Sequence, residues 1–380
     1  MSFPRIVLWA DQYFNPSGVG VYTRNLIKHL QLIECDFNFT VVYPGQVRSA
    51  VIPVYKGSTE VKYIADKRVL YPIWNLIPIP RLEMFIGDFD LIHILSGTVR
   101  IPTRWPRVIT VTDLASEFKA YGYPWRRRWF KQRLLVEAKH RGDFFITISE
   151  ASRNDLVRFL GIPRERIDVT LLGVDTECFY PLSDQEVLQS VRKRYGLPDR
   201  FYLFVGVLSP RKNVTLLLKA YDCLNKRLKG APGLVIVGPP LGWKENRIYK
   251  EWRAMEYRDK VKFVGFVNQA DLHTIYSAAT ALVYPSLYEG FGLPVLEAMA
   301  CGTPVICSSA SALPEVAGNA ALYVSGHSVN EMAEAMERIV VDTHLRDTLR
   351  MAGFQRIGGF SWTRCAQATA EVYKRLLEHV

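Results

Sequence analysis

The chain has 380 residues, of which 49% are hydrophobic and 22% are charged. This composition is typical of a folded globular protein and excludes disordered and fibrous classes, and at roughly 100–200 residues per domain the length predicts two domains. The formal net charge of +11 favours an anionic partner, such as a nucleic acid, lipid headgroups or a phosphorylated substrate.

No apolar stretch approaches the roughly 18 uninterrupted residues of a membrane-spanning helix, so we expect none. The first residues also lack the basic-then-apolar order of a secretion signal. The six cysteines form no Cys-x-x-Cys pair, and no His cluster has zinc-ligand spacing. We therefore expect buried thiols in a reducing, cytoplasmic compartment, with no resident cofactor and no obligatory metal ion.

Short apolar runs alternate with helical patterns through the first half of the chain. The runs predicted as strands are residues 5–10, 39–43, 91–95, 108–111, 144–148 and 167–171. Between the first two, apolar residues from Val21 to Leu30 recur at helical spacing. Ser149 is a suitable N-cap for a further helix that reaches Leu160.

The second half of the chain repeats this alternation. Its predicted strands are residues 202–205, 234–237, 261–263, 281–284, 305–307 and 321–323. Helices are predicted after Asn213 and over residues 269–278 and 293–300. Strands that alternate with helices indicate a parallel sheet covered on both faces, so the sequence predicts an α/β protein with two doubly wound, Rossmann-like domains.

A cluster of Pro181, Ser183 and Asp184 marks the predicted domain boundary. It gives an N-terminal domain of residues 1–183 and a C-terminal domain of residues 184–361. Ligands bind at the carboxyl ends of the strands in such sheets. With two sheets that face each other, the site is expected in the cleft between them.

A glycine-bearing loop, with Gly18 and Gly20, separates the first predicted strand from the first helix. Backbone N–H groups at a helix N-terminus favour an anion. The dinucleotide-binding fingerprint would require a third glycine where Thr23 stands. The loop is therefore as well explained by a tight turn as by a binding site.

Two cations, Arg211 and Lys212, follow the strand at residues 202–205 and precede a predicted helix. Arginine offers a planar fork and lysine a point charge, so the pair suits a diphosphate. Positive charge is unfavourable near a helix N-terminus, which favours a functional explanation over a solvated surface pair.

Two carboxylates, Glu289 and Glu297, flank the turn Gly-Phe-Gly-Leu-Pro. Pro294 suits the first turn of a helix that would carry Glu297. Carboxylates accept paired hydroxyl donors, so sugar hydroxyls are a natural ligand. Either glutamate alone would be interpreted as an ordinary surface acid, but the two glutamates together with the glycine-rich turn between them indicate a binding site.

The string from Glu289 to Glu297, with seven residues between them, resembles the signature of retaining nucleotide-sugar glycosyltransferases of family 4, which have the GT-B fold. The resemblance extends over nearly the whole chain in the expected order. The further matching segments are Gly18-x-Gly20, Arg211-Lys212, Val237-Gly238, the loop of Gly265, Phe266 and Val267, and residues 360–363 at the start of a final helix.

This resemblance implies roles for these residues. Glu289 would hold the donor sugar, aided by the backbone N–H groups of Phe291, Gly292 and Leu293. Glu297 would hold the ribose. Arg211 and Lys212 would neutralise the diphosphate as the glycosidic bond breaks. The N-terminal domain would bind the acceptor and would be completed by a C-terminal helix over residues 362–380.

One departure from the family pattern concerns the end of the strand at residues 108–111. Many relatives carry His-Asp there, and this chain carries Thr112 and Asp113. Threonine is shorter and cannot carry positive charge, which leaves the sugar open and admits a 6-deoxy sugar. Asp113 is the candidate for orienting the acceptor. His93 ends the neighbouring strand and is more readily a core histidine than a site residue.

A basic segment lies between Lys119 and Arg141, where eight Lys and Arg residues face a single acid. The residues proposed to meet a membrane or the acceptor are Trp125, Arg126, Arg127, Arg128, Trp129, Lys131 and Arg133. Tryptophan among cations on a helix is typical of binding to an anionic membrane surface. The alternatives are a solvated basic face with its aromatic residues buried, or direct binding of acceptor phosphate.

The favoured function is transfer of a hexose from a nucleotide-diphosphate sugar, GDP-mannose being the first candidate, to a saccharide or polyprenyl-diphosphate-linked glycan on the inner face of the cytoplasmic membrane. UDP-glucose, UDP-N-acetylglucosamine and a rhamnose donor remain alternatives. A nucleic-acid-binding protein would explain the charge but not the glutamate string. A nicotinamide oxidoreductase is disfavoured, because Tyr43 stands where an acid is needed.

Overall fold

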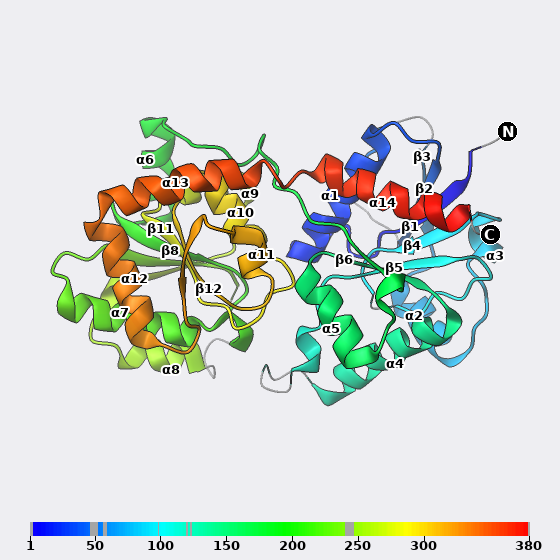
Figure 1. Cartoon of the computed structure of the whole chain (residues 1–380), viewed down its shortest axis with the longest axis horizontal. Helices are drawn as coiled ribbons and strands as arrows, with labels where there is room; N and C mark the ends of the chain where they lie inside the picture. The colour runs from blue at the N-terminus through cyan, green and yellow to red at the C-terminus, as the bar shows by residue number, and fades with distance from the viewer. Residues whose placement is uncertain are drawn as a thin grey trace. The chain divides into compact units, whose positions relative to one another are not determined.

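The computed structural model describes residues 3–45, 52–55, 59–97, 99–118, 121, 124–239 and 247–378, without the side chain of Arg127. The chain divides into two compact units. The N-terminal unit comprises Met1–Lys119, Tyr123–Gly173 and Trp362–Val380, and the C-terminal unit comprises Ala120–Gly122 and Val174–Ser361. Each unit is an α/β domain with helices around a parallel sheet (Figure 1).

Over its described residues, the N-terminal unit has a seven-stranded sheet in the order β3-β2-β1-β4-β5-β6-β7, and all its pairs are parallel. The strands are β1 Arg5–Trp9, β2 Asn38–Pro44, β3 Thr59–Ile64, β4 Leu91–Ile94, β5 Arg107–Val111, β6 Phe144–Thr147 and β7 Ile167–Val169. Central β4 and β5 are buried throughout, as expected for strands covered on both faces. The sequence missed edge strand β3.

The helices of the N-terminal unit include one that comes from the end of the chain. They are α1 Gly18–Leu32, α2 Lys67–Leu76, α3 Glu83–Ile86, α4 Trp125–Arg141, α5 Glu150–Leu160 and α14 Trp362–Leu377. Ser149 caps α5 as predicted, because its side chain accepts a hydrogen bond from Ser152 N. Helix α14 packs beside α1 (Figure 1), so residues 362–377 complete the N-terminal unit.

A buried chain of hydrogen bonds connects α14 to the sheet. The Tyr373 hydroxyl lies 2.5 Å from His93 Nδ1, and His93 Nε2 lies 2.7 Å from Thr110 Oγ1. Thr110 Oγ1 also lies 2.8 Å from the Tyr22 hydroxyl of α1. Burial lowers the pKa of His93 to about 3, so the imidazole is neutral. His93 is therefore a core residue and not part of a site.

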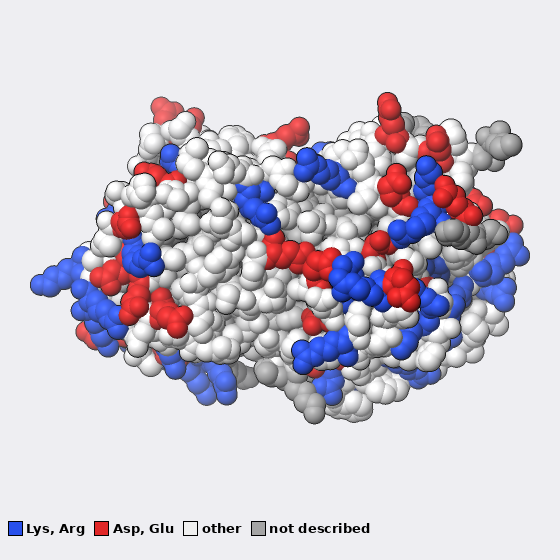
Figure 2. Space-filling view, viewed as in Figure 1, with Lys and Arg blue, Asp and Glu red and all other residues white. Residues whose placement is uncertain are grey.

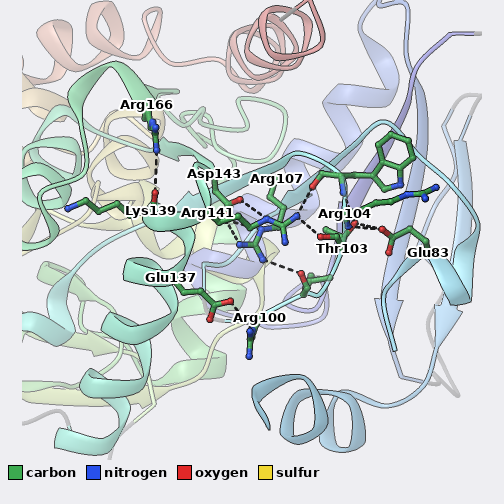
Figure 3. A network of polar contacts seen from close by, with 12 residues as sticks. Glu83, Arg100, Thr103, Arg104, Arg107, Glu137, Lys139, Arg141, Asp143 and Arg166 are labelled. Carbon is green, nitrogen blue, oxygen red and sulfur yellow. Dashed lines mark hydrogen bonds and ion pairs between the residues drawn. The ribbon is translucent and has the colours of Figure 1, made fainter. Parts of the chain in front are cut away.

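The amino ends of the same sheet hold a buried ionic network (Figure 3). Arg107 begins β5, and its guanidinium contacts Asp143, with Nε 2.8 Å from Oδ2. Arg141, in the last turn of α4, contacts the other carboxylate oxygen at 3.4 Å. Arg107 also donates to Ile101 O, and Arg141 to Thr103 O. These contacts tie α4 and β5 to the loop before β6.

The described residues of the C-terminal unit form a six-stranded parallel sheet in the order β10-β9-β8-β11-β12-β13. Its strands are β8 Phe201–Val205, β9 Gly233–Val237, β10 Val261–Gly265, β11 Ala281–Tyr284, β12 Val305–Ser308 and β13 Ala321–Val324. Its helices are α6 Gln185–Tyr195, α7 Val214–Arg227, α8 Arg247–Ala254, α9 Gln269–Ala278, α10 Leu293–Ala300, α11 Leu313–Ala317, α12 Val329–Val341 and α13 Thr343–Ile357.

The boundary between the units lies after Gly173, earlier than the predicted boundary at Ser183. The intervening residues pack on the C-terminal unit. The Phe179 ring lies 5.9 Å from that of Tyr276, and His273 Nε2 donates to Tyr180 O at 2.6 Å. The Pro-Ser-Asp cluster therefore marks the start of α6, where Asp184 is the N-cap, and not the change of unit.

All six cysteines are free thiols. Cys301, Cys307 and Cys365 are buried as expected. Cys35, Cys178 and Cys223 are only partly buried, so the prediction of buried thiols holds for half of them.

Candidate functional site

Each sheet has a point at which its strand order reverses. In the N-terminal unit the chain builds outward from β1 through β2 and β3 and then returns to place β4 on the other side of β1. In the C-terminal unit the same reversal separates β8 from β11. Ligands of doubly wound sheets bind at the carboxyl ends of the strands beside such a reversal. Of the predicted site residues, Gly18 and Gly20 follow β1, Arg211 and Lys212 follow β8, and Glu289 follows β11.

In the C-terminal unit, the loop after β8 carries the two predicted cations. Pro210–Lys212 form a single 3₁₀ turn, and Asn213 adopts a left-handed conformation with φ of 55° before α7 begins. The Asn213 side chain donates to Gly326 O at 2.7 Å, which holds this conformation. The turn directs Arg211 and Lys212 toward the loop after β11.

Glu289, in the loop after β11, binds both cations. Its Oε2 lies 2.7 Å from Arg211 Nη1 and its Oε1 lies 2.6 Å from Lys212 Nζ. Glu289 is 5% exposed and Lys212 6% exposed. Burial alone would raise the pKa of Glu289, but the charges of Lys212 and Arg211 outweigh it and lower the pKa to about 2. The predicted catalytic residues of this unit therefore form one buried, ionised cluster.

Tyr284, which the sequence did not single out, completes this cluster. It is the last residue of β11 and is fully buried. Its hydroxyl contacts Lys212 Nζ, which also lies 4.6 Å from the centre of the tyrosine ring. Burial raises the pKa of Tyr284, and the charge of Glu289 raises it further, so its hydroxyl stays protonated. Lys212 is thus held between a carboxylate and a phenol.

Glu297 lies on α10, apart from the ion pairs. Its Oε2 accepts a hydrogen bond of 2.8 Å from the Tyr276 hydroxyl of α9. Burial raises the pKa of Glu297 to about 7, and the hydrogen bond from Tyr276 offsets only part of this effect. Its charge also contributes to the raised pKa of Tyr284, so Glu297 lies within electrostatic reach of the cluster.

The turn before α10 has the geometry that its sequence predicts. Gly292 has a φ of 118°, a conformation that other residues rarely adopt, and Pro294 lies in the first turn of α10. Phe291 is buried against Phe360, with ring centres 5.8 Å apart. Leu293 is the first residue of α10. The first N–H groups of this helix therefore lie beside the Glu289 loop.

The loop of Gly265, Phe266 and Val267 lies farther along the sheet. It follows β10, which β9 separates from β8. Phe266 is 67% exposed and Val267 is buried. The structure thus places this predicted donor segment at the carboxyl edge of the same sheet, but at its outer strand.

The N-terminal unit has a pocket of about 380 Å³ at the carboxyl ends of β1, β4 and β5. Its lining residues are Gln12, Asn15, Ser17, Val19, Ser96, Val111, Thr112, Asp113, Ser116, Phe130 and Lys131. Asp113 therefore lies where the sequence placed it. Gly18 and Gly20 begin α1 beside this pocket, but neither lines it. A Cβ at Gly20 would lie 1.8 Å from Asn15 O, so close packing requires glycine there.

Beneath this pocket lies Asp11, a buried acid that the sequence did not single out. Asp11 is 3% exposed. Its carboxylate accepts hydrogen bonds from Ser96 Oγ at 3.0 Å, Tyr71 OH at 2.9 Å and Gln12 Nε2 at 2.9 Å. It stands two residues after the end of β1, and this position was the only available signal of its role.

Helix α4 separates the residues of the basic segment into two groups. Trp125, Trp129 and Arg133 lie at helical spacing on its exposed face, and the tryptophans are 67% and 53% exposed. An arginine lies over each tryptophan ring, Arg126 at 5.6 Å and Arg133 at 5.4 Å. The explanation with buried aromatic residues is therefore wrong.

The other face of α4 turns toward the pocket. Lys131 Nζ donates to Asp113 O at 2.7 Å, and Phe130 lines the pocket beside it. Arg128 is partly buried, and the side chain of Arg127 lies outside the described residues. Figure 2 shows Lys and Arg side chains along the region of this unit where α4 runs in Figure 1. No helix within the described ranges has the length and apolarity needed to cross a bilayer.

Within the described residues, no group of three or more His, Cys, Asp and Glu side chains is arranged to hold a metal ion. The chain has an Asp-x-Asp pair at Asp88 and Asp90, directly before β4. Asp88 pairs with Arg104 at 2.7 Å, and Asp90 accepts a hydrogen bond from Arg5 N. This pair therefore lies at the amino end of the sheet, away from the pocket.

Comparison with known proteins agrees with this arrangement. Residues 16–178 match the family model Glycosyltransferase Family 4, and residues 189–356 match the model Glycosyl transferases group 1. One relative, O-antigen chain mannosyltransferase B of Escherichia coli, is 28% identical over 95% of this chain and 96% of its own length. Another, D-inositol 3-phosphate glycosyltransferase of Salinispora arenicola, is 32% identical over 76% of this chain and 69% of its own length.

Solved structures of other proteins share this fold. A solved structure, sucrose-phosphate synthase from Thermosynechococcus elongatus, superposes with a TM-score of 0.79 at 22% identity and covers 99% of this chain and 100% of its own. The two Rossmann-like domains are those of the GT-B fold. The resemblance inferred from the glutamate string is thereby confirmed, and the chain belongs to the family 4 glycosyltransferases.

Proposed function

We propose that this glycosyltransferase transfers a hexose, with retention of its anomeric configuration, from a nucleotide-diphosphate sugar to a saccharide acceptor in glycan biosynthesis. Mannose from GDP-mannose is the first candidate, because a relative named as an O-antigen chain mannosyltransferase matches over nearly the full length of both chains. The acceptor is a glycan that carries a lipid diphosphate.

The contact of Arg211 and Lys212 with Glu289 is the observation that carries this proposal. Negative charge develops on the leaving diphosphate as the bond to the sugar breaks. Two fixed cations at the end of β8 can stabilise that charge, and neither must be brought in at the moment of reaction. Tyr284 holds the Lys212 ammonium in place. Arg211 adds a planar fork that can bind two phosphate oxygens.

Glu289 then has two roles. It keeps the cations oriented, and its carboxylate oxygens can accept donor-sugar hydroxyls through their additional lone pairs. With a pKa of about 2 it is ionised at neutral pH and is unsuited to act as a general acid. We therefore assign the acceptor proton to the leaving diphosphate. The acceptor oxygen bonds to the anomeric carbon on the face that the diphosphate leaves.

Helix α4 supports the proposal of a lipid-linked acceptor. Its outer face carries exposed tryptophans with arginines over them, which suits the interface of an anionic bilayer. Its inner face places Phe130 and Lys131 at the pocket that contains Asp113. One helix can therefore contact the membrane and the acceptor's sugar at the same time.

A thermal-shift panel tests the donor. The native chain is melted with GDP, UDP and dTDP and with GDP-mannose, UDP-glucose, UDP-N-acetylglucosamine and dTDP-rhamnose. A ligand that binds the folded state raises the melting temperature, so guanine nucleotides are expected to give the largest rise. A larger rise with a uridine or thymidine nucleotide transfers the assignment to that donor. No rise with any nucleotide contradicts the proposed function.

Glu289→Gln and Arg211→Ala serve as paired variants in that panel. Arg211→Ala should remove most of the rise with free nucleoside diphosphate, because it removes half of the clamp. Glu289→Gln should lose transfer but keep part of the rise, because the amide oxygen can still accept from one of the two cations, whereas the carboxylate contact to the sugar is lost. Proton NMR of the product's anomeric signal then decides retention: the product of an inverting enzyme would refute the assigned proton path.

A further inference from the structure

We infer that Asn213 and Ser311 are positioning residues for sugar transfer: Asn213 fixes the two cations, and Ser311 fixes the carboxylate that they bind. The inference rests on the proposed function, in which Arg211, Lys212 and Glu289 act on the donor. Among the described residues, Asn213 and Ser311 are the only two non-glycine residues with a positive φ, at 55° and 54°.

A positive φ is unfavourable for a residue with a side chain, so it persists only where surrounding contacts hold it. Residues held in this way cluster at sites where a group has to be placed accurately. Both residues lie at the carboxyl edge of the C-terminal sheet, Asn213 after β8 and Ser311 after β12. Strand β11 lies between those two strands, so the two residues flank the loop that follows it.

That loop carries Glu289 and accepts hydrogen bonds from both side chains. The Ser311 hydroxyl donates to Glu289 O at 2.6 Å. Asn213 Nδ2 lies 3.3 Å from Pro285 O and 2.7 Å from Gly326 O, the latter in the loop after β13. The two side chains therefore hold the two ends of the segment from Pro285 to Glu289.

The backbone between these ends is held by the same neighbouring segments. Leu287 N donates to Arg211 O at 2.8 Å, and Arg211 Nη1 donates to Tyr288 O at 3.0 Å. Ser308, the last residue of β12, donates to Ser286 O. A shift of either neighbouring segment would therefore change the distance between the cations and the carboxylate.

Each residue controls one side of the ion pairs. Asn213 directly follows Lys212, and its left-handed conformation ends the 3₁₀ turn, so it sets the direction in which the two cations leave that turn. Ser311 holds the main chain of Glu289. Asn213 is only partly buried and Ser311 is exposed, so neither side chain contributes much to the core. Placement of the charges, and not core packing, accounts for the two unfavourable conformations.

Alanine and glycine variants separate placement from stability. Asn213→Ala, Asn213→Gly, Ser311→Ala and Ser311→Gly all lose the side-chain hydrogen bond, but only glycine adopts a positive φ without strain. Each glycine variant should therefore melt above its alanine counterpart. All four should nevertheless lower kcat by about tenfold or more, because a misplaced group loses its effect on the transition state. The glycine variants give the answer even where an alanine variant fails to fold.

Donor turnover is followed as release of nucleoside diphosphate from the nucleotide sugar that gives the largest rise in the thermal-shift panel, expected to be GDP-mannose. kcat should fall by a larger factor than KM for this donor rises. A displaced cation still attracts the diphosphate, but it no longer meets the charge that develops as the bond breaks.

Asn225→Ala is the matched control. Asn225 Nδ2 donates to Tyr221 O at 2.8 Å within α7, so the variant also removes a bond from a side-chain amide to a backbone carbonyl in the same unit. It should lower the melting temperature without changing kcat, because α7 holds this amide away from the ion pairs.

The inference is overturned if a glycine variant turns over like wild type, or if the loss of rate follows the loss of melting temperature across the variants. Lys212→Ala keeps these outcomes separate from the proposed function. Slow turnover in Lys212→Ala with normal turnover in the Asn213 and Ser311 variants removes the positioning role and leaves the clamp standing. Normal turnover in Lys212→Ala removes the clamp, and the proposed function with it.

Discussion

Both units bury a cluster of opposite charges, but they do so at opposite ends of their sheets. In the N-terminal unit Arg107 and Asp143 meet at the amino ends of β5 and β6. In the C-terminal unit Arg211, Lys212 and Glu289 meet at the carboxyl ends of β8 and β11. Burial and pairing are alike in the two clusters, so these properties do not identify a site. The C-terminal cluster is distinguished by its position, because ligands of such sheets bind at the carboxyl ends of the strands beside the reversal of strand order.

The contrast extends to what each unit places at its carboxyl edge. The C-terminal unit places two cations paired with one carboxylate there, and the N-terminal unit places amides and hydroxyls around Asp11, with Asp113 and Lys131 beside them. The two sheets therefore differ in the side-chain chemistry that they place at the same edge.

The largest expected effect is on stability, at the amino-end cluster. Arg107→Ala leaves the Asp143 carboxylate buried with only the more distant Arg141, so the free energy of unfolding should fall by about 3–5 kcal/mol. Urea denaturation measures this loss. The transfer rate per folded molecule should remain that of wild type. A large loss of transfer rate with unchanged stability would show instead that the amino-end cluster serves catalysis.

The carboxyl-end cluster should respond in the opposite way. Lys212→Ala removes a cation from the leaving diphosphate, so kcat should fall by about 10²–10³-fold. Steady-state transfer at saturating donor measures the fall. Lys219→Ala, at an exposed lysine of α7 that pairs with Glu251, is the matched control. Turnover near wild type in Lys212→Ala would exclude the clamp.

A smaller effect is expected at α4, where charge faces outward. Each cation near an anionic surface contributes about 1 kcal/mol, so Arg126→Ser combined with Arg133→Ser should weaken binding to phosphatidylserine vesicles by about tenfold or more. Co-sedimentation with the vesicles measures this loss of binding. Exposed cations of α7, changed as Lys219→Ser with Lys226→Ser, serve as the control. Equal losses of vesicle binding in the two double variants would indicate that net charge, and not a membrane-binding face on α4, determines binding.

The smallest effect is a pH dependence at Glu297. Its pKa is raised to about 7. We propose that Glu297 binds the ribose, because the ionised carboxylate can accept from both hydroxyls, whereas protonation turns one of its oxygens into a donor. Affinity for a nucleoside diphosphate should therefore rise severalfold from pH 6 to pH 8. Titration calorimetry measures this rise, and Glu297→Gln should flatten the part of the profile that belongs to this residue. An identical profile in the variant would remove Glu297 from ribose binding.

Much of the fold could be predicted because the sequence pattern is regular. Helices α9 and α10 span the predicted residues 269–278 and 293–300. Strand β3 escaped prediction because it lies at the sheet edge, where exposed and partly buried positions mix and no continuous apolar run forms. The boundary was placed late because proline and serine mark a helix start as readily as a linker.

The site residues likewise include some that the sequence could predict and some that it could not. Arg211, Lys212 and Glu289 could be predicted because a motif with a chemical purpose carries them. Asp11 and Tyr284 could not, since their importance lies in contacts between segments far apart in the sequence. Lys131 was grouped with its charged neighbours, and only the rotation of α4 shows that it faces the pocket. Periodicity gives a helix its faces, but packing decides which face turns inward.

Helix α14 imposes an order on biosynthesis. The ribosome makes β1 to β7 before the whole C-terminal unit, yet Tyr373, the hydrogen-bond partner of His93, is made only after that unit. Until then the side of α1 against which α14 packs stays open, and His93 has no phenol beside it. The N-terminal unit therefore cannot complete its packing until the C-terminal unit has been synthesised. A fragment ending at Gly173 should therefore be less stable than its own sheet would suggest.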